Sequence, residues 1–134
     1  MSAMGTPPVP PIISILDGDL GIHDSLSEAV GYFCFEDAIS EDLELIDSTG
    51  QFLRARPYGR YAVTFELDTT RPADPEHAAE QLRRWIERTS DHMDYGQTDV
   101  GAAGLPELIE IIRAGRTLVP IPTLFNALRS IFRR

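Results

Sequence analysis

Residues 17–28 read DGDLGIHDSLSE and space oxygen-bearing side chains as in a twelve-residue calcium loop. Asp17, Asp19 and Glu28 match loop positions 1, 3 and 12, which carry carboxylates in such loops. Position 6 requires glycine for a sharp turn, and Ile22 stands there instead. The glutamate also closes an S-x-x-E capping box. We therefore expect a turn that leads into a capped helix, and no metal site.

The other reactive residues form no catalytic motif. Asp91, His92 and Asp94 lie in one polar stretch and would act as an enzyme only if the fold oriented them toward one another. Cys34 lies in GYFCFED among aromatic residues, which predicts a buried and inert thiol. Walker A, G-x-S-x-G and G-x-G-x-x-G motifs are absent from the sequence, and so is lysine. We expect a non-enzymatic protein without a cofactor.

Charge is the most unusual property of the sequence. The net charge is −9, and ten acidic residues precede the first basic residue, Arg54. Residues 113–134 show the opposite bias, with five arginines and no acid. A dense negative charge repels phosphates, which argues against binding to nucleic acid. It suits a basic protein partner, and it also keeps a protein soluble.

The acids in the first half of the chain are the candidate partner-binding residues. We expect them to form one surface that steers a basic protein, such as a toxin, and covers it. The residues are Asp37, Glu41, Asp42, Glu44 and Asp47.

Hydrophobic periodicity predicts the elements that would position these residues. Period-2 alternation and flanking turn residues predict strands, and three- and four-residue spacing with capping signals predicts helices. Together they predict an α+β fold in which an antiparallel β-meander has helices packed on one face and a C-terminal helical extension. The expected strands are 43–47, 52–56 and 61–67, with 12–16 as a further strand of the sheet; the expected helices are 26–33, 75–88 and 106–114.

The chain is expected to form one domain with extensions. Prolines predict a flexible tail, and a run rich in glycine and aspartate predicts a loop or hinge. The expected parts are a proline-rich tail at 1–11, an α+β core at 12–90, a loop or hinge at 91–104 and a helical extension at 105–134 that packs on the core or on a partner.

The end of that extension is the second candidate contact surface. A helix is expected at 123–132, with Phe125, Leu128 and Phe132 on one face for contact with a partner or a second copy. Homo-oligomeric scaffolding, with a homodimer as its simplest form, is therefore the alternative function. The segment is short and its parent acidic, which disfavours membrane binding.

The sequence also predicts where the protein works. Cys34 has no second cysteine to pair with, no apolar run is long enough to span a membrane, and the first residues do not read as a signal peptide. We expect a cytoplasmic protein.

From Ser25 to Leu67 the order of elements is a short capped helix, an acidic strand, a D-x-x-G-x-x-L hairpin (Asp47, Gly50, Leu53) and an alternating strand, followed by a D-P-E helix. This order resembles small uncharacterised proteins of high-GC actinobacteria, and its style is similar to single-domain immunity proteins that neutralise bacterial toxins. The resemblance implies inhibition of a partner by binding, without catalysis.

Overall fold

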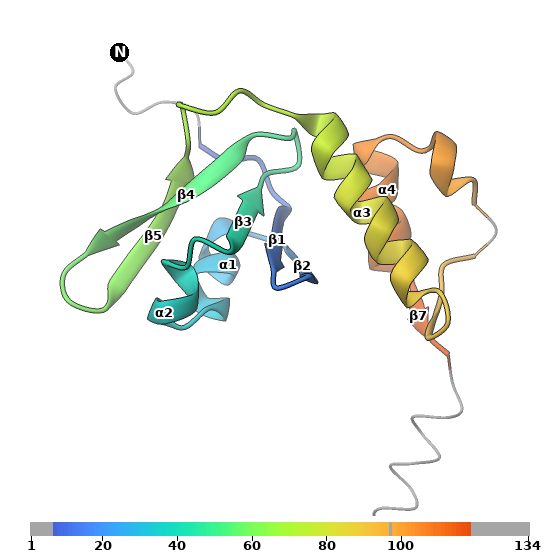
Figure 1. Cartoon of the computed structure of the whole chain (residues 1–134), viewed down its shortest axis with the longest axis horizontal. Coiled ribbons are helices and arrows are strands. Elements are labelled where there is room, and N and C mark those ends of the chain that lie inside the picture. Colours follow the sequence, from blue (N-terminus) through green and yellow to red (C-terminus); the bar gives the residue numbers. More distant parts are fainter. Residues whose placement is uncertain (1–6, 97, 119–134) are drawn as a thin grey trace, which may run out of the picture.

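The computed structural model describes residues 7–96 and 98–118 and confirms the α+β class. Its main feature is a five-stranded antiparallel sheet with the strand order β2-β1-β3-β4-β5 (Figure 1). Strand 12–16 does join the sheet, and it lies at the second position. The strands are β1 (Ile12–Leu16), β2 (Asp19–His23), β3 (Leu43–Ile46), β4 (Phe52–Tyr58) and β5 (Ala62–Leu67).

Strand β2 was not expected from the sequence. Asp17 and Gly18 both have positive φ, at 51° and 87°, which is the backbone of a tight two-residue hairpin. The chain therefore turns back at once, and Leu16 pairs with Asp19. An extended strand now occupies the middle of the stretch that resembled a calcium loop, which excludes the loop conformation.

Helices α1 (Leu26–Tyr32) and α2 (Phe35–Ala38) cover one face of the sheet (Figure 1). The expected capping box is present, because Ser25 Oγ accepts from the amide of Glu28 at 3.1 Å. The glutamate carboxylate accepts in return from the amide of Asp24 at 3.0 Å. The buried side chains of this layer are Ile12, Ala29, Ala38, Leu45, Leu53, Val63 and Phe65.

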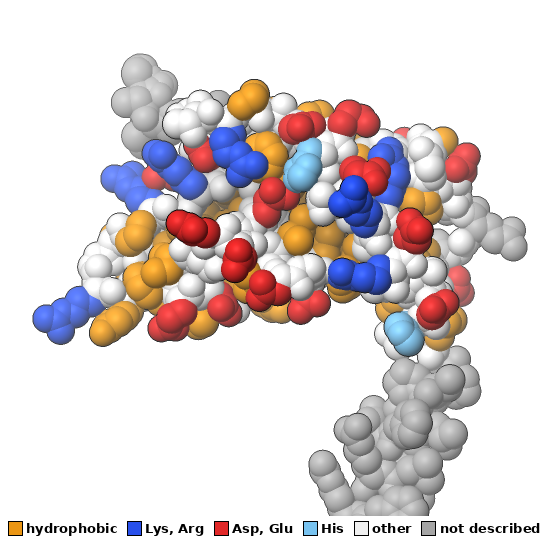
Figure 2. All heavy atoms as spheres, viewed as in Figure 1, with side chains coloured by type: hydrophobic (Ala, Val, Ile, Leu, Met, Phe, Trp, Pro, Cys, Tyr) orange, Lys and Arg blue, Asp and Glu red, His pale blue; other side chains and the backbone are white. Residues whose placement is uncertain are grey.

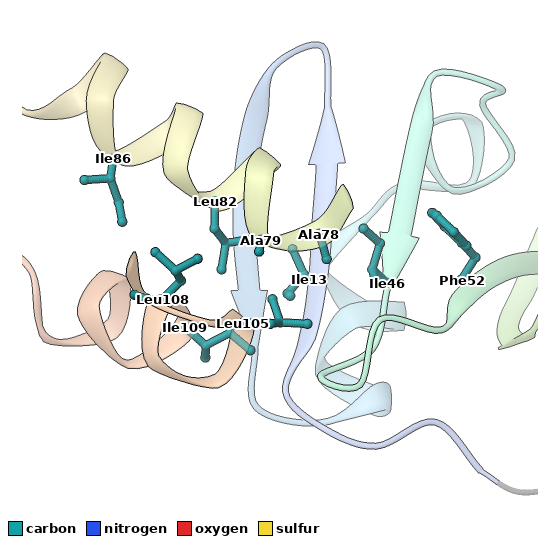
Figure 3. Close-up of a cluster of buried hydrophobic side chains, with 11 residues drawn as sticks. Ile13, Ile46, Phe52, Ala78, Ala79, Leu82, Ile86, Leu105, Leu108 and Ile109 are labelled. Carbon is teal, nitrogen blue, oxygen red and sulfur yellow. The ribbon is translucent and has the colours of Figure 1, made fainter. Parts of the chain in front are cut away.

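Helices α3 (Pro75–Thr89) and α4 (Leu105–Ala114) cover the other face, over β1 and β3 (Figure 3). Ile12 and Ile13 thus belong to different layers, since neighbouring side chains of a strand point to opposite faces. The sequence analysis placed helices 26–33 and 75–88 on the same face; the structure divides them between the two. The buried side chains of this second layer are Ile13, Ile46, Phe52, Ala78, Ala79, Leu82, Ile86, Ala103, Leu105, Leu108 and Ile109.

The stretch expected to be a loop or hinge contains short regular elements. Strand β6 (Met93–Asp94) pairs with β7 (Arg116–Thr117), and a 3-10 turn, η2, spans Val100–Ala102. The Arg83 guanidinium donates to the carbonyl oxygens of Val100 and Ala103 at 3.3 and 2.9 Å. The stretch from Met93 to Ala103 is therefore fastened to α3 at one end and to β7 at the other.

Parts of both termini lie outside the described residues, and the expected helix 123–132 falls among them. Of the proline-rich tail, the described part is 7–11, and its Val9 carbonyl accepts from the amide of Ser48 at 3.0 Å. This contact ties the start of the chain to the turn after β3.

Candidate functional site

Three acidic residues lie at one end of the sheet because of strand register. Leu16, the last residue of β1, pairs with Asp19 on one side and with Leu43 on the other. Asp17 and Asp42 are the next residues along the same two strands, and both line one shallow cavity. Segments separated by more than twenty residues in the sequence thus place Asp17 and Asp42 on one cavity, and Asp19 at the same sheet end lines another.

Two further acids, Asp37 of α2 and Glu41 of the following loop, extend this surface. Asp37 lines a cavity together with Asp19, which joins α2 to the sheet end. We call Asp17, Asp19, Asp37, Glu41 and Asp42 the acidic end; all five are exposed. Figure 2 shows a row of acidic side chains along the lower part of the body.

The acidic end has no compensating cation within the described part of the chain. Every ion pair found there involves other acids, namely Asp24, Glu44, Glu66 and Glu80. The guanidinium of Arg88 comes near, but it donates to the carbonyl of Gly18 and stacks over Trp85 at 5.1 Å. The five carboxylates are therefore exposed without an ion-pair partner among the described residues.

Exposed aromatic and aliphatic side chains flank the acidic end. Tyr32 is 69% exposed, Ile39 44% and Tyr61 79%. They come from α1, from the residue after α2 and from the β4–β5 turn, and α2 packs on β5. Phe35 joins these elements through an edge contact with Tyr61, with ring centroids 5.8 Å apart. We call Tyr32, Ile39 and Tyr61 the exposed apolar residues; they come from elements next to the acidic end.

A cavity of about 310 Å³, which we call the hairpin cavity, opens between the β1–β2 hairpin and the two small helices. Asp19 and Asp37 contribute carboxylates to it, and Tyr32 and Phe33 contribute rings. The remaining lining residues are Ser14, Leu16, Leu20 and Gly21.

Beneath the hairpin cavity lies a buried polar pair that the sequence analysis missed. Ser14 Oγ and His23 Nε2 are 2.8 Å apart, and the two residues are 3% and 7% exposed. Desolvation lowers the pKa of His23, against the opposing charges of Glu28 and Asp24. A neutral imidazole is therefore favoured at this position. The pair could have been predicted only from the β1–β2 register, because Ser14 and His23 lie on the same face only when β2 folds back on β1.

Asp47 is a correction to the expected partner-binding set. It is 1% exposed, so no partner can reach it. Its carboxylate accepts from the amides of Val9, Thr49 and Gln51 at 3.0, 2.9 and 3.0 Å, and from the Thr49 hydroxyl at 2.6 Å. The residue orders the turn between β3 and β4, because its side chain saturates the local donors.

Glu44 belongs to a local network and not to the free acidic surface. Its carboxylate contacts His77 Nε2 at 2.7 Å and the Arg71 guanidinium at 3.8 Å. The same guanidinium lies 3.6 Å over the ring of Phe52. This network joins β3 to α3 and compensates the charge of Glu44. Of the expected set, Asp37, Glu41 and Asp42 are exposed, as are Asp17 and Asp19.

Cys34 corrects a second expectation, because its thiol is exposed. The chain bends between α1 and α2, with Cys34 as the N-cap of α2. Phe33 and Phe35 on either side pack against the core, and the residue between them faces outward.

The other candidate residues do not form a site. Asp91, His92 and Asp94 are exposed around the start of β6, and no contact joins their side chains. No metal-ligating group of three is found among the described residues, including Asp17, Asp19 and Glu28. Phe125, Leu128 and Phe132 lie outside the described residues.

No model of a protein family, no curated protein and no solved structure matches this chain. Among the described helices, none has the length and apolar character needed to cross a membrane.

Proposed function

We propose that this is a non-enzymatic binding protein of the immunity or inhibitor kind, which covers a basic protein partner with its acidic end. The observation that carries the proposal is the exposure of Tyr32, Ile39 and Tyr61 on elements next to five exposed carboxylates, none of which forms an ion pair with another described residue. The proposal includes a cytoplasmic location, where the lone thiol of Cys34 stays reduced.

The two parts of the surface have different roles in binding. Unpaired acids raise the association rate with a basic protein and make it sensitive to salt. Tyrosines supply buried contact area at low entropic cost, and they are enriched among residues that dominate interface energies. Exposed Tyr32 and Tyr61 are therefore the anchors, and the acidic end is the steering element.

The test compares two variants of equal net charge. In the first, Asp37, Glu41 and Asp42 are changed to lysine; in the second, the exposed acids Glu87, Asp91 and Glu110 are changed to lysine. The partner is first captured from host lysate at low salt and purified, and its association rate is measured over a range of salt concentrations.

We expect the first variant to associate at least about tenfold more slowly at low salt, with a flatter salt dependence, since steering falls with ionic strength. The second variant should stay close to the unmodified protein. If both variants associate equally slowly, the slower rate results from the change in net charge alone, and the proposed binding surface is wrong.

The competing hypothesis is a homo-oligomeric scaffold assembled through Phe125, Leu128 and Phe132. Light scattering of the protein alone over a wide concentration range separates the two functions. A mass that stays monomeric, and is unchanged when the three residues become serine, argues against the scaffold.

A further inference from the structure

We propose that the hairpin cavity receives one arginine side chain of the basic partner, which stacks on Tyr32 and pairs with Asp19 and Asp37. The inference rests on the proposed function and deepens it by naming the group that the partner inserts. It also assigns a role to the hairpin cavity, which has none in electrostatic steering by the acidic end.

The lining of the hairpin cavity matches both halves of an arginine side chain. Leu16 and Phe33 offer apolar surface to the methylene stem, which arginine buries readily. Asp19 and Asp37 offer carboxylates to the guanidinium. A volume of about 310 Å³ has room for one such side chain.

The charge of the cavity favours a cation. Its lining residues include two acids and no arginine, and neither acid forms an ion pair within the described part of the chain. The nearest titratable ring, His23, is held neutral by burial, so no positive charge opposes the incoming guanidinium. An arginine there would form charge-assisted hydrogen bonds with carboxylates that are exposed and form no ion pair with another described residue.

The aromatic wall is held in place before any ligand arrives. The ring of Tyr32 lies 5.0 Å from that of His23 and 4.9 Å from that of Phe33, although Tyr32 is largely exposed. His23 is fixed in turn by its hydrogen bond with Ser14. Binding therefore loses little side-chain entropy on the side of the receptor.

Gly21 keeps the cavity floor in this arrangement. A Cβ at this position would lie 2.8 Å from Ser14 Oγ and 3.0 Å from His23 Nε2. Any larger residue would push the Ser14–His23 pair out of position and disturb the Tyr32 ring, which lies against His23 at an interplanar angle of 55°.

The geometry selects arginine over lysine. A guanidinium is planar, stacks on an aromatic face and presents several donors to carboxylates on different sides. An ammonium is a compact, strongly hydrated charge that cannot stack in this way. A cavity with an aromatic wall and two carboxylates therefore discriminates by shape as well as by charge.

The test uses the full chain and three small probes: the N-acetyl amides of arginine, lysine and citrulline. Citrulline keeps the shape of arginine without the charge. Binding is followed by amide chemical shifts in NMR titrations, together with those of Asp19→Asn, Tyr32→Leu and the control variant Glu87→Gln.

We expect the arginine probe to bind weakly but saturably, to shift the amides of the cavity lining, and to bind at least about fivefold better than the lysine and citrulline probes. Asp19→Asn and Tyr32→Leu should each weaken it at least about threefold, while Glu87→Gln leaves it unchanged. Equal shifts with citrulline, or shifts spread over all exposed acids, would overturn the inference.

A second arm tests the source of the guanidinium, because the chain carries Arg129, Arg133 and Arg134 near its end. The full chain with these three changed to glutamine should bind the arginine probe with unchanged affinity. Tighter binding would show that the chain's own arginines compete for the cavity, and it would overturn the assignment to a partner.

The same variants separate this inference from the proposed function. If charge reversal of Asp37, Glu41 and Asp42 slows association with the partner while Asp19→Asn leaves the dissociation rate unchanged, the binding surface stands and the arginine receptor fails. Tyr32→Leu tests both proposals, because Tyr32 is an anchor in the first and the aromatic wall in the second. Faster dissociation of Asp19→Asn and Tyr32→Leu supports both.

Discussion

The amide of Val9 donates a hydrogen bond of 3.0 Å to the carboxylate of Asp47, which lies 38 positions further along the chain. The same carboxylate orders the β3–β4 turn through Thr49 and Gln51. One buried acid therefore fixes both the entry of the chain into β1 and the turn that follows β3.

Replacement of Asp47 should destabilise the fold. Asp47→Ala removes a buried carboxylate that accepts four hydrogen bonds from partly buried donors, and it should lower the free energy of unfolding by about 3 kcal/mol; Asp47→Asn should lower it by somewhat less. Urea denaturation measures both. The exposed Asp42→Asn serves as the control and should stay within about 0.5 kcal/mol. A similar effect for Asp42 and Asp47 would contradict the structural role of Asp47.

Gly50 should be intolerant of any side chain. Its φ is 92°, and a Cβ there would lie 2.6 Å from the Cα and N atoms of Pro75. Gly50→Ala should cost roughly 3 kcal/mol or more, because backbone strain adds to a clash with backbone atoms. Gly59→Ala has positive φ but open space and should cost only about 1 kcal/mol. Thermal denaturation of the two variants tests whether the clash exists.

Stability should fall as the pH drops below 6.5, the usual pKa of histidine. Burial lowers the pKa of His23 in the folded state, so the unfolded chain binds this proton first and is favoured at lower pH. The contribution of neutral His23 to the free energy of unfolding is complete above pH 6.5, and it is lost as the pH falls toward the lowered pKa of the folded state.

The matched variant for this prediction is His23→Gln. Its free energy of unfolding should depend less steeply on pH between about 7 and 5, as measured by urea denaturation at each pH. Asp68, whose pKa the Thr70 hydroxyl lowers, titrates below 3.8 and does not contribute in this range. Parallel curves for the variant and the unmodified protein would rule out His23 as the source.

Cys34 should react as a free surface thiol. Because Cys34 is exposed at the start of α2, the native protein should react with Ellman's reagent about as fast as the denatured chain. If a partner binds as proposed, it should slow the reaction, since Cys34 lies between Tyr32 and Asp37 in the sequence. A thiol that reacts only after denaturation would contradict the position of Cys34.

Local signals in the sequence predicted most elements correctly. The capping box at Ser25, the Asp74-Pro75 start of α3 and the alternation along β5 each act within a few residues, so each could be recognised without the fold. The α+β class and the antiparallel sheet followed from the order of these elements.

Strand β2 was not predicted because its residues, DLGIH, have a glycine in the centre and resemble a loop. They become a strand through pairing with β1. The burial of Asp47 and the exposure of Cys34 were also not predicted. Both depend on which segments pack over the residue in the fold, and the neighbouring residues in the sequence do not reveal this.

The sequence by itself determined the charge, the turns, the caps and the hydrophobic periods, because these depend on residues close together in the chain. Only the tertiary structure decided that Asp17, Asp19 and Asp42 lie at one sheet end, that Glu44 beside them is paired with His77 and Arg71, and that Asp47 is buried. Register and burial are properties of paired strands and packed layers, which bring distant segments together. The acidic end and the hairpin cavity exist for that reason, and no single stretch of the sequence contains either.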